Sequence, residues 1–409
     1  MKFAHFADLH LGYEQYNLSW RTEDFANAFR RAAEIAVSEG VDFAIIAGDL
    51  FHKSVPNPKT LNEAIEVLKI FKKNSVPVFA VEGNHDKSIR EISAYHLLES
   101  LELLNLLGLR RERAEGEYLR SVKVENVYLV KGLFDGVEIV GEKHRTRWQL
   151  EKVLPHLKLQ KSDILVLHQA VKEAIDIDMN IAWDLTIEQL PKARYYALGH
   201  VHMQREMRIG DSYLVYPGSI ERYDSREASL FISFGERLER REGWKKGFYI
   251  VENFKPRFVP LETRELYSIS IDAQKRSEAE KKFIDVLGNL KNTGIGVVKI
   301  ICEENVDTTK LTELALKSLK HVEISFKRRY IEEIVTMKPE KEFFSDFEMK
   351  LLEVLRDEEL SLNAALELIK EYYGLEKEKK EEKVVETLKG ETEIKEKREK
   401  KFRTLLDFI

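Results

Sequence analysis

Apolar runs of strand length alternate with amphipathic stretches over the first two thirds of this chain. Five of the runs read as buried strands: Lys2 to Ala7, Asp42 to Ala47, Val76 to Glu82, Asp163 to Leu167 and Tyr195 to Leu198. Apolar residues recur at helical spacing over Thr22 to Ser38 and Lys59 to Asn74, and after Val201 the pattern turns strand-rich. The alternation predicts a layered α/β domain over residues 1–262, with sheets inside and helices outside.

A second, smaller unit follows this domain. Its pattern reads strand, helix, strand, helix, strand: Leu266 to Ile271, Ser277 to Leu290, Gly296 to Cys302, Thr308 to Leu319 and Val322 to Lys327. The segment contains no cluster of metal-binding side chains. We therefore predict a small α/β domain over residues 263–332 that has no metal site.

The rest of the chain, residues 333–409, is predicted to be a linker and a helical tail. Two apolar stripes have helical spacing: Phe343, Phe344, Phe347, Leu351, Leu352 and Leu355, then Leu362, Ala365, Leu366, Ile369, Tyr372 and Tyr373. A Lys/Glu-rich run separates them from an apolar end that includes Leu405 and Leu406. Stripes of this size are typical of a binding surface, although they could fold back onto the chain's own domains. We favour a partner surface, with contacts through Phe343, Phe347, Leu351, Leu405 and Leu406.

Short polar motifs stand where the five strand runs end. They are Asp8-Leu9-His10, Gly48-Asp49, Gly83-Asn84-His85-Asp86, His168 and Gly199-His200-Val201-His202. Residues beyond the carboxyl ends of strands meet at one rim of an open α/β sheet. Asp, His and Asn without cysteine suit manganese, iron(II) or zinc, and Asp49, in the middle of the series, is the natural carboxylate to bridge two ions. Two such ions clamp a phosphoryl group and lower the pKa of a shared water.

Each motif has an ordinary explanation when it is taken alone. A single histidine at a strand end is more often a satisfied or exposed side chain than a ligand, and a single Gly-Asp is more often a turn. Five motifs in this order, each after a strand pattern, make coincidence improbable, so the set predicts a metal site.

The motifs also resemble those of a known family. DLH, GDLFH, GNHD, LHQ and GHVH resemble the blocks of calcineurin-like metallophosphoesterases. The longer strings FADLHLGYEQYN, IIAGDLFHKSVPNPKTL, VFAVEGNHD and YYALGHVHM resemble the nuclease subunit of the DNA double-strand-break repair complex, the meiotic-recombination-eleven family, in its archaeal form. The resemblance is strong over residues 1–260 and extends to the remainder only in layout. It implies a metallophosphoesterase sandwich with a capping domain that helps to bind DNA.

The resemblance assigns roles residue by residue. It implies two Mn²⁺ ions, one held by Asp8, His10, Asp49 and His202 and the other by Asp49, Asn84, His168 and His200. His85 then faces the substrate, where it donates a proton to the leaving oxygen or stabilises the phosphate charge. Asp86 orients the His85 imidazole, or is instead a turn or helix-capping residue. His52 matches a family histidine that handles substrate.

The same resemblance implies a function and partners. The function is 3′ to 5′ exonuclease and single-strand endonuclease activity on DNA ends, in a homodimer with a partner ATPase of the ABC class that has a long coiled coil. Two alternatives stay open: a phosphomonoesterase or small phosphodiesterase of the same superfamily, and a DNA-tethering scaffold. The chain has no GxxxxGK[ST] loop, so ATP must be handled by the partner.

Composition limits how DNA can be bound and where the protein works. The formal charge of −5 and the pI near 6.2 lack the basic signature of a nucleic-acid binder, so DNA affinity must be local. Candidate cations near the motifs are Lys53 and Arg90, with Lys87, Arg145, Arg147 and Lys172, although any one of them is more often plain surface charge. Where relatives often have cations, Val55 and Met203 stand instead. A single cysteine, Cys302, and the absence of an apolar run of membrane length predict a cytoplasmic, nucleoid-associated protein.

Overall fold

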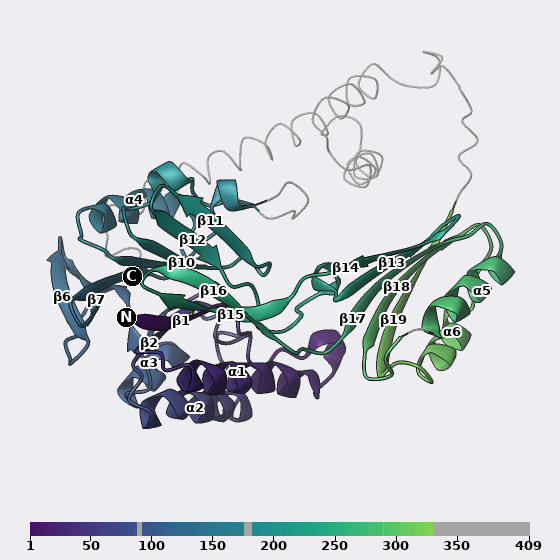
Figure 1. The fold of residues 1–409 in the computed structure, drawn as a ribbon, viewed down its shortest axis with the longest axis horizontal. Coiled ribbons are helices and arrows are strands. Elements are labelled where there is room, and N and C mark those ends of the chain that lie inside the picture. Colours follow the sequence, from purple (N-terminus) through teal and green to yellow (C-terminus); the bar gives the residue numbers. More distant parts are fainter. Residues whose placement is uncertain (88–91, 176–181, 289, 330–409) are drawn as a thin grey trace, which may run out of the picture. The chain divides into compact units, whose positions relative to one another are not determined.

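The computed structural model describes residues 1–87, 92–175, 182–288 and 290–329 (Figure 1), and Met1–Arg329 belong to one compact unit. The expected tail lies outside the described residues, together with its predicted contacts: Phe343, Phe347, Leu351, Leu405 and Leu406. The predicted DNA contact Arg90 lies outside them as well.

The first sheet carries the three amino-terminal metal motifs. Its strand order is β16-β15-β1-β2-β3-β4. The bounds are β1 (Lys2–Phe6), β2 (Phe43–Ala47), β3 (Val78–Val81), β4 (Asn105–Leu106), β15 (Lys246–Glu252) and β16 (Lys255–Leu261). Strands β1 to β4 run parallel, so β1, β2 and β3 end on the same edge of the sheet.

The second sheet carries the remaining motifs. Its order is β11-β12-β10-β9-β8-β7-β5, and β6 pairs with β7. The bounds are β5 (Gly108–Arg110), β6 (Leu119–Val124), β7 (Val127–Phe134), β8 (Val137–Glu142), β9 (Ile164–His168), β10 (Tyr195–Gly199), β11 (Arg205–Ile209) and β12 (Ser212–Tyr216). Strands β8, β9, β10 and β12 are parallel, which places the ends of β9 and β10 side by side.

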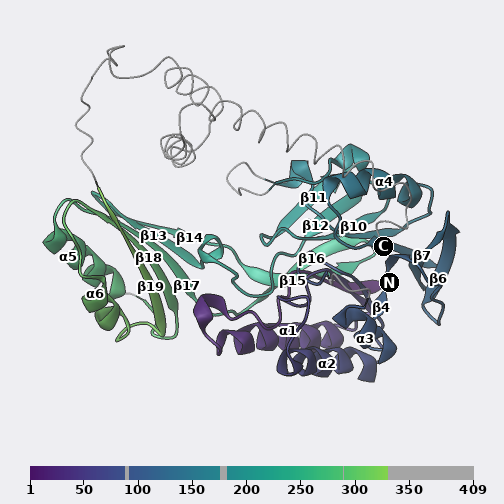
Figure 2. The ribbon, with the colours of Figure 1, turned by 180° about the vertical axis from the view of Figure 1, so that it is seen from behind.

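The two sheets form the middle layers of a sandwich, which confirms the predicted layered α/β fold. Helices α1 (Arg21–Ser38), α2 (Pro58–Lys73) and α3 (Ala94–Ser100) lie on the side of the first sheet, and α4 (Arg147–Lys158) lies on the side of the second (Figures 1 and 2). Side chains alternate along β1: Phe3 faces the core between the sheets, whereas Ala4 and Phe6 face the core beneath the helices. Both faces of the strand are thus buried, as its continuous apolar run predicts.

Local sequence signals explain where these helices begin. The Asn57 side chain accepts a hydrogen bond from the Thr60 amide, and Pro58 occupies the first turn of α2, where a missing N–H costs nothing. Thr146 and Gln149 form a reciprocal capping box at the start of α4. None of the described helices combines the length and the apolar character that a membrane span requires.

The third sheet matches the second predicted unit but is larger than expected. Its order is β14-β13-β17-β18-β19, with β13 (Leu230–Phe234), β14 (Leu238–Glu242), β17 (Leu266–Asp272), β18 (Ile295–Cys302) and β19 (His321–Arg328). Helices α5 (Arg276–Leu287) and α6 (Thr308–Ala315) pack on it around one apolar core. Two strands, β13 and β14, come from residues before 262, whereas the sequence pattern placed the whole unit after that residue. The domain boundaries themselves stay a prediction.

A histidine is buried between the two facing sheets. His5 on β1 has no exposed surface, and its Nδ1 lies 3.0 Å from the Tyr195 hydroxyl on β10. Burial lowers the pKa of His5 from 6.5 to about 3. The imidazole is therefore neutral in the folded protein at pH values where it is protonated in the unfolded chain.

This pKa predicts a pH-dependent loss of stability. Above about pH 6.5 the lowered pKa of His5 in the folded protein does not affect the free energy of unfolding. As the pH falls from about 6.5 towards 3, the free energy of unfolding decreases by up to about 1.4 kcal/mol per pH unit. Urea unfolding at pH 7 and pH 5 should show a smaller acid-induced loss for the His5→Leu/Tyr195→Phe double variant than for Tyr195→Phe, the matched control. Equal losses in the two proteins would contradict the assignment.

Candidate metal centre

The side chains that the sequence marked as metal ligands meet where the two sheets end together. Asp8 and Asp49 each follow their strand by two residues, Asn84 follows β3 by three, and His168 is the last residue of β9. His200 and His202 come directly after β10. The sheets are joined at this rim because the His168 ring nitrogen Nδ1 donates to the carbonyl of Ala47 on β2, at 2.7 Å.

One set of ligands surrounds the His10 imidazole. Its Nε2 lies 3.1 Å from Nε2 of His202 and 3.8 Å from Oδ2 of Asp49, and Nε2 of His202 lies 3.8 Å from Oδ1 of Asp8. An imidazole nitrogen that does not carry the proton presents a lone pair, so the two facing nitrogens can bind one shared cation. Asp8, His10, Asp49 and His202 therefore fit one divalent ion.

A second set surrounds the Asn84 side-chain oxygen. Oδ1 of Asn84 lies 3.1 Å from Nε2 of His168 and 3.0 Å from Nδ1 of His200. Oδ2 of Asp49 is 3.3 Å from Nε2 of His168, so the same carboxylate oxygen faces both sets. The donors are oxygens and imidazole nitrogens, which suit divalent ions of borderline to hard character.

The charges of the site are set by burial and by mutual contact. Burial keeps the pKa of His10 well below its usual range and, with His168 nearby, lowers that of His200 to about 3. Burial alone would raise the pKa of Asp49, but the neighbouring His168 and His10 outweigh it and hold that pKa below its usual range. Conversely, Asp49 outweighs burial and raises the pKa of His168 to about 9. Dense carboxylate and imidazole pairing of this kind is typical of functional sites.

The backbone is strained at the ligands. Four of the candidate ligands have φ angles in the left-handed region, which residues other than glycine seldom adopt. The angles are 52° at Asp8, 44° at His10, 53° at Asp49 and 89° at His200. Hydrogen bonds hold the turns in place: the Asp8 amide donates to the Gly48 carbonyl at 3.1 Å, and the His10 amide donates to the Asp49 carbonyl at 2.9 Å. The four residues thus leave their strands through sharp turns, and their ligand atoms lie at the edge where the two sheets end.

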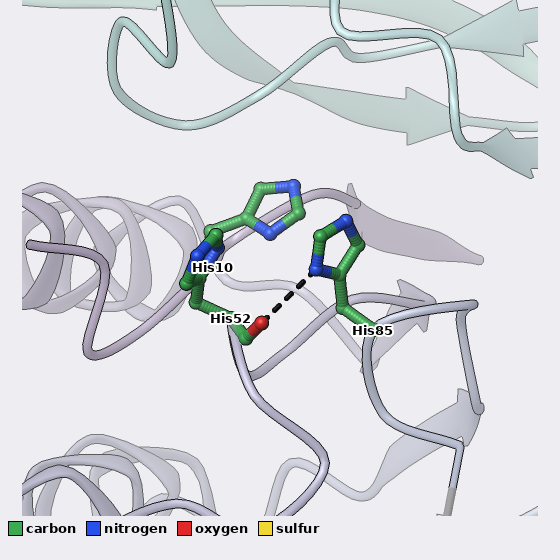
Figure 3. A group of neighbouring side chains, drawn as sticks. All are labelled: His10, His52 and His85. Carbon is green, nitrogen blue, oxygen red and sulfur yellow. Dashed lines mark hydrogen bonds between the residues drawn. The ribbon is translucent and has the colours of Figure 1, made fainter. Parts of the chain in front are cut away.

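His85 and His52 lie beside the first set of ligands, as the sequence suggested. Donor atoms of His10, His52 and His85 lie within 4.8 Å of one another, and Nδ1 of His85 lies 3.0 Å from the carbonyl oxygen of His52 (Figure 3). The His85 amide donates to Oδ1 of Asp49 at 2.9 Å. Burial, with His85 and Lys53 adding to it, lowers the pKa of His52 to about 4, so His52 is uncharged near neutral pH.

Asp86 was expected to orient the His85 imidazole, but its carboxylate has other hydrogen-bond partners. Its carboxylate accepts from the amides of Phe51 and Gly83, both at 2.9 Å, and from the Tyr95 hydroxyl at 2.8 Å. The His85 imidazole is oriented instead by the carbonyl of His52. Asp86 therefore fixes the turns that carry Asp49 and His85, which is the turn-residue alternative.

Sequence reasoning missed the residue that orients His202. Nδ1 of His202 lies 3.0 Å from Oε1 of Glu227, whose other oxygen is held by Ser219 and by an ion pair with the buried Lys246. A carboxylate on the far side of a ligating imidazole fixes its tautomer and leaves Nε2 free for the ion. Glu227 ends the short 3-10 helix η5 (Ser225–Glu227), which carries no motif, so no local signal could have marked it.

His144 and Asp184 were also missed. Ligand atoms of His144, Asp184 and His200 lie within 4.8 Å of one another, and the Lys87 amine lies 3.0 Å from Nδ1 of His144. Lys87 is thus engaged by a neighbour, and Arg145 forms a buried ion pair with Glu142 at 2.7 Å.

The three remaining predicted cations, Lys53, Arg147 and Lys172, lie on the surface, and so does one of the departures. Lys53 is exposed, and so is Val55, at 76%. Arg147 is exposed and stacks on the Trp183 ring at 4.1 Å.

Comparison with known proteins places this fold and site. Residues 1–204 match the calcineurin-like phosphoesterase family. The DNA double-strand break repair protein Mre11 of Archaeoglobus fulgidus is 50% identical over all of this chain and 99% of its own length. The Mre11 proteins of Saccharolobus solfataricus and Methanocaldococcus jannaschii are 30% and 31% identical, each over 62% of this chain and over 60% and 62% of their own lengths.

The fold and the strand-end site define a calcineurin-like phosphoesterase, a class that binds divalent metal ions. Because the similarity to one relative extends over the whole chain, the chain belongs to the Mre11 family of DNA double-strand break repair nucleases. The resemblance seen in the sequence motifs is thereby confirmed.

Asp49 is positioned by a close backbone approach, which gives a test of the site. A Cβ atom at Gly83 would lie 2.0 Å from Oδ1 of Asp49, whereas a Cβ at Gly116 would meet nothing within 4 Å. Gly83→Ala should therefore displace the shared carboxylate and weaken the binding of both ions by roughly 10- to 100-fold. Calorimetric titration with the metal ion measures the affinity of each variant, and Gly116→Ala is the matched control. Equal metal affinities for the two variants would show that Asp49 is not the shared ligand.

Proposed function

We propose that this chain is a two-metal DNA nuclease with 3′ to 5′ exonuclease and single-strand endonuclease activity. One ion is held by Asp8, His10, Asp49 and His202, the other by Asp49, Asn84, His168 and His200, and the ions are Mn²⁺. The observation that carries the proposal is that one oxygen of Asp49 faces ligands of both sets, at 3.3 Å from His168 and 3.8 Å from His10. When bound, two divalent ions lower the pKa of a shared water and offset the charge of a phosphodiester.

The chain's own residues supply the remaining chemistry. Because Nδ1 of His85 is engaged with the His52 carbonyl, any proton that His85 gives away leaves from Nε2. We assign this imidazole to protonating the leaving oxygen of the DNA strand. His52 keeps His85 in place through its carbonyl and through its own ring, whose centroid is 5.2 Å from that of His85. Glu227 holds the His202 ring so that its Nε2 faces the first ion.

Partners and setting belong to the same proposal. We infer a homodimer and a cytoplasmic complex with an ABC-class ATPase that has a long coiled coil, bound through the tail. Two observations support the tail: its apolar stripes, and the similarity to the Archaeoglobus relative, which extends through it. For DNA, the exposed Lys53 is the predicted contact that lies beside the site.

The proposed reaction is tested by comparing substrates. End-labelled linear DNA and single-stranded circles should be degraded with Mn²⁺ and not after chelation, because the two ions carry the reaction. A generic aryl phosphate monoester and a cyclic nucleotide should react far more slowly. Faster turnover of either small substrate than of DNA would favour the phosphomonoesterase or small-phosphodiesterase alternative, and metal binding without any hydrolysis would favour the scaffold.

One variant separates the role of His85 from metal binding in the same assay. His85→Gln should retain both ions, counted by mass spectrometry, and should retain DNA binding. Its single-turnover cleavage should fall by roughly 10²- to 10⁴-fold, the range for a lost general acid. Loss of an ion, or an unchanged rate, would contradict the assignment.

The tail proposal has its own test. Deletion of residues 340–409 should leave Mn²⁺-dependent cleavage intact and abolish stable co-purification with the ATPase. Replacing Leu405 and Leu406 by lysine should weaken the complex, since a charge must then be buried or the contact opened. A truncated protein that still binds the ATPase with unchanged affinity, or that unfolds, would show that the stripes serve another purpose.

A further inference from the structure

A run of four aromatic rings passes beside the metal centre. The centroids of His85 and His52 are 5.2 Å apart, those of His52 and Tyr13 4.2 Å, and those of Tyr13 and Tyr223 4.5 Å. The interplanar angles in the same order are 28°, 31° and 21°. The row curves round rather than stacking in a straight line, because the Tyr223 centroid also lies 5.8 Å from that of His52, at 50°, and 6.5 Å from that of His85, at 71°. We call this curved row of His85, His52, Tyr13 and Tyr223 the aromatic ladder.

The ladder borders the first set of metal ligands along its length. At its Tyr223 end, the ring centroid lies 4.7 Å from that of His10 and 4.6 Å from that of His202. At its other end, the His85 centroid lies 4.9 Å from that of His10. A phosphate held at this ion would therefore have the ladder within reach of its neighbouring sugar and base.

The two tyrosines of the ladder keep part of their surface accessible to solvent. Both rings are partly exposed, and within the described residues neither hydroxyl has a hydrogen-bond partner, although buried tyrosines usually find one. Tyrosine side chains carry no charge at neutral pH. An uncharged aromatic surface suits the face of a nucleobase.

We propose that Tyr13 and Tyr223 bind an unpaired nucleobase of the DNA substrate by stacking, next to the phosphate at the metal centre. This inference rests on the proposed nuclease function and adds the part of the substrate that the protein recognises. A base within a duplex already stacks on its neighbours, so the contact favours single strands and frayed ends. Every base has a π-face, so the contact does not select a sequence.

The competing explanation is that Tyr223 only packs against the ligand rings. Its ring meets the His202 ring at 72° and the His10 ring at 50°, contacts that could hold both imidazoles in place without touching DNA. A packing role would affect the cleavage of every substrate equally. A stacking role depends on whether the base is present.

The experiment combines protein variants with abasic DNA. Single-turnover cleavage with Mn²⁺ is measured on an end-labelled single-stranded oligonucleotide, and an abasic residue replaces each nucleotide around a mapped cleavage position in turn. At one position the abasic residue should lower kcat/KM of the wild-type protein by roughly 10- to 100-fold, the range for one lost stacking contact. Tyr223→Leu should lose a similar factor on intact DNA and little more on the abasic strand. Tyr223→Phe keeps the ring and should restore the dependence on the base.

Matched controls fix the interpretation. Tyr128→Leu removes a partly exposed tyrosine from β7, a strand without site residues, and should keep the wild-type dependence on the base. Equal losses for Tyr223→Leu on intact and abasic DNA, or no base dependence in the wild-type protein, would overturn the inference and leave the nuclease function standing. If Tyr223→Leu loses an ion by mass spectrometry, Tyr13→Leu decides, because the Tyr13 ring contacts Phe25, His52 and Tyr223 and none of the proposed ligands. A wild-type protein that cleaves no DNA would overturn both proposals.

Discussion

The placement of the buried Asp49 carboxylate is the constraint on which the site depends. One of its oxygens accepts the His85 amide, and the other faces His10 on one side and His168 on the other. These two histidines come from different sheets, since His10 follows β1 of the first sheet and His168 ends β9 of the second. A buried carboxylate of this kind is costly unless cations or donors surround it, and here imidazoles and a backbone amide do so. The Asp49 carboxylate thus links the two facing sheets and also belongs to the candidate metal centre.

Positioning that carboxylate requires backbone conformations that the strands alone would not supply. The chain leaves β1, β2 and β10 through left-handed residues, and each such residue costs of order 1–3 kcal/mol unless its surroundings hold it. The apolar cores on both faces of the first sheet supply that hold, with β1 and β2 buried along nearly their whole length. The buried strands hold the strained turns in place, and these turns position the candidate metal ligands.

The sequence predicted what is local and missed what depends on tertiary contact. Buried parallel strands are continuous apolar runs, so β1, β2, β9 and β10 and the residues after them could be located from the pattern. Glu227 and Tyr223 reach the site from the connection between β12 and β13, which has no periodicity, and only the fold shows that they lie against His202. Asp86 stands in a motif, but its partners are the amides of Phe51 and Gly83 and the hydroxyl of Tyr95, which no spacing in the sequence could reveal.

The connectivity of the third sheet has a consequence for how the protein can be divided. Strands β13 and β14 enter this sheet before β15 and β16 return to the first sheet, and β17 then comes back to pair in parallel with β13. The two sheets are therefore interleaved along the chain, and neither is a block that can be cut away at one point. A fragment that ends after β16 keeps the β13–β14 hairpin but lacks β17, the strand that pairs with β13. In that fragment Ile232 also loses the apolar core that β17 and β18 supply. The third sheet is thus built from strands on both sides of β15 and β16 in the chain, and it is not a module appended at one point.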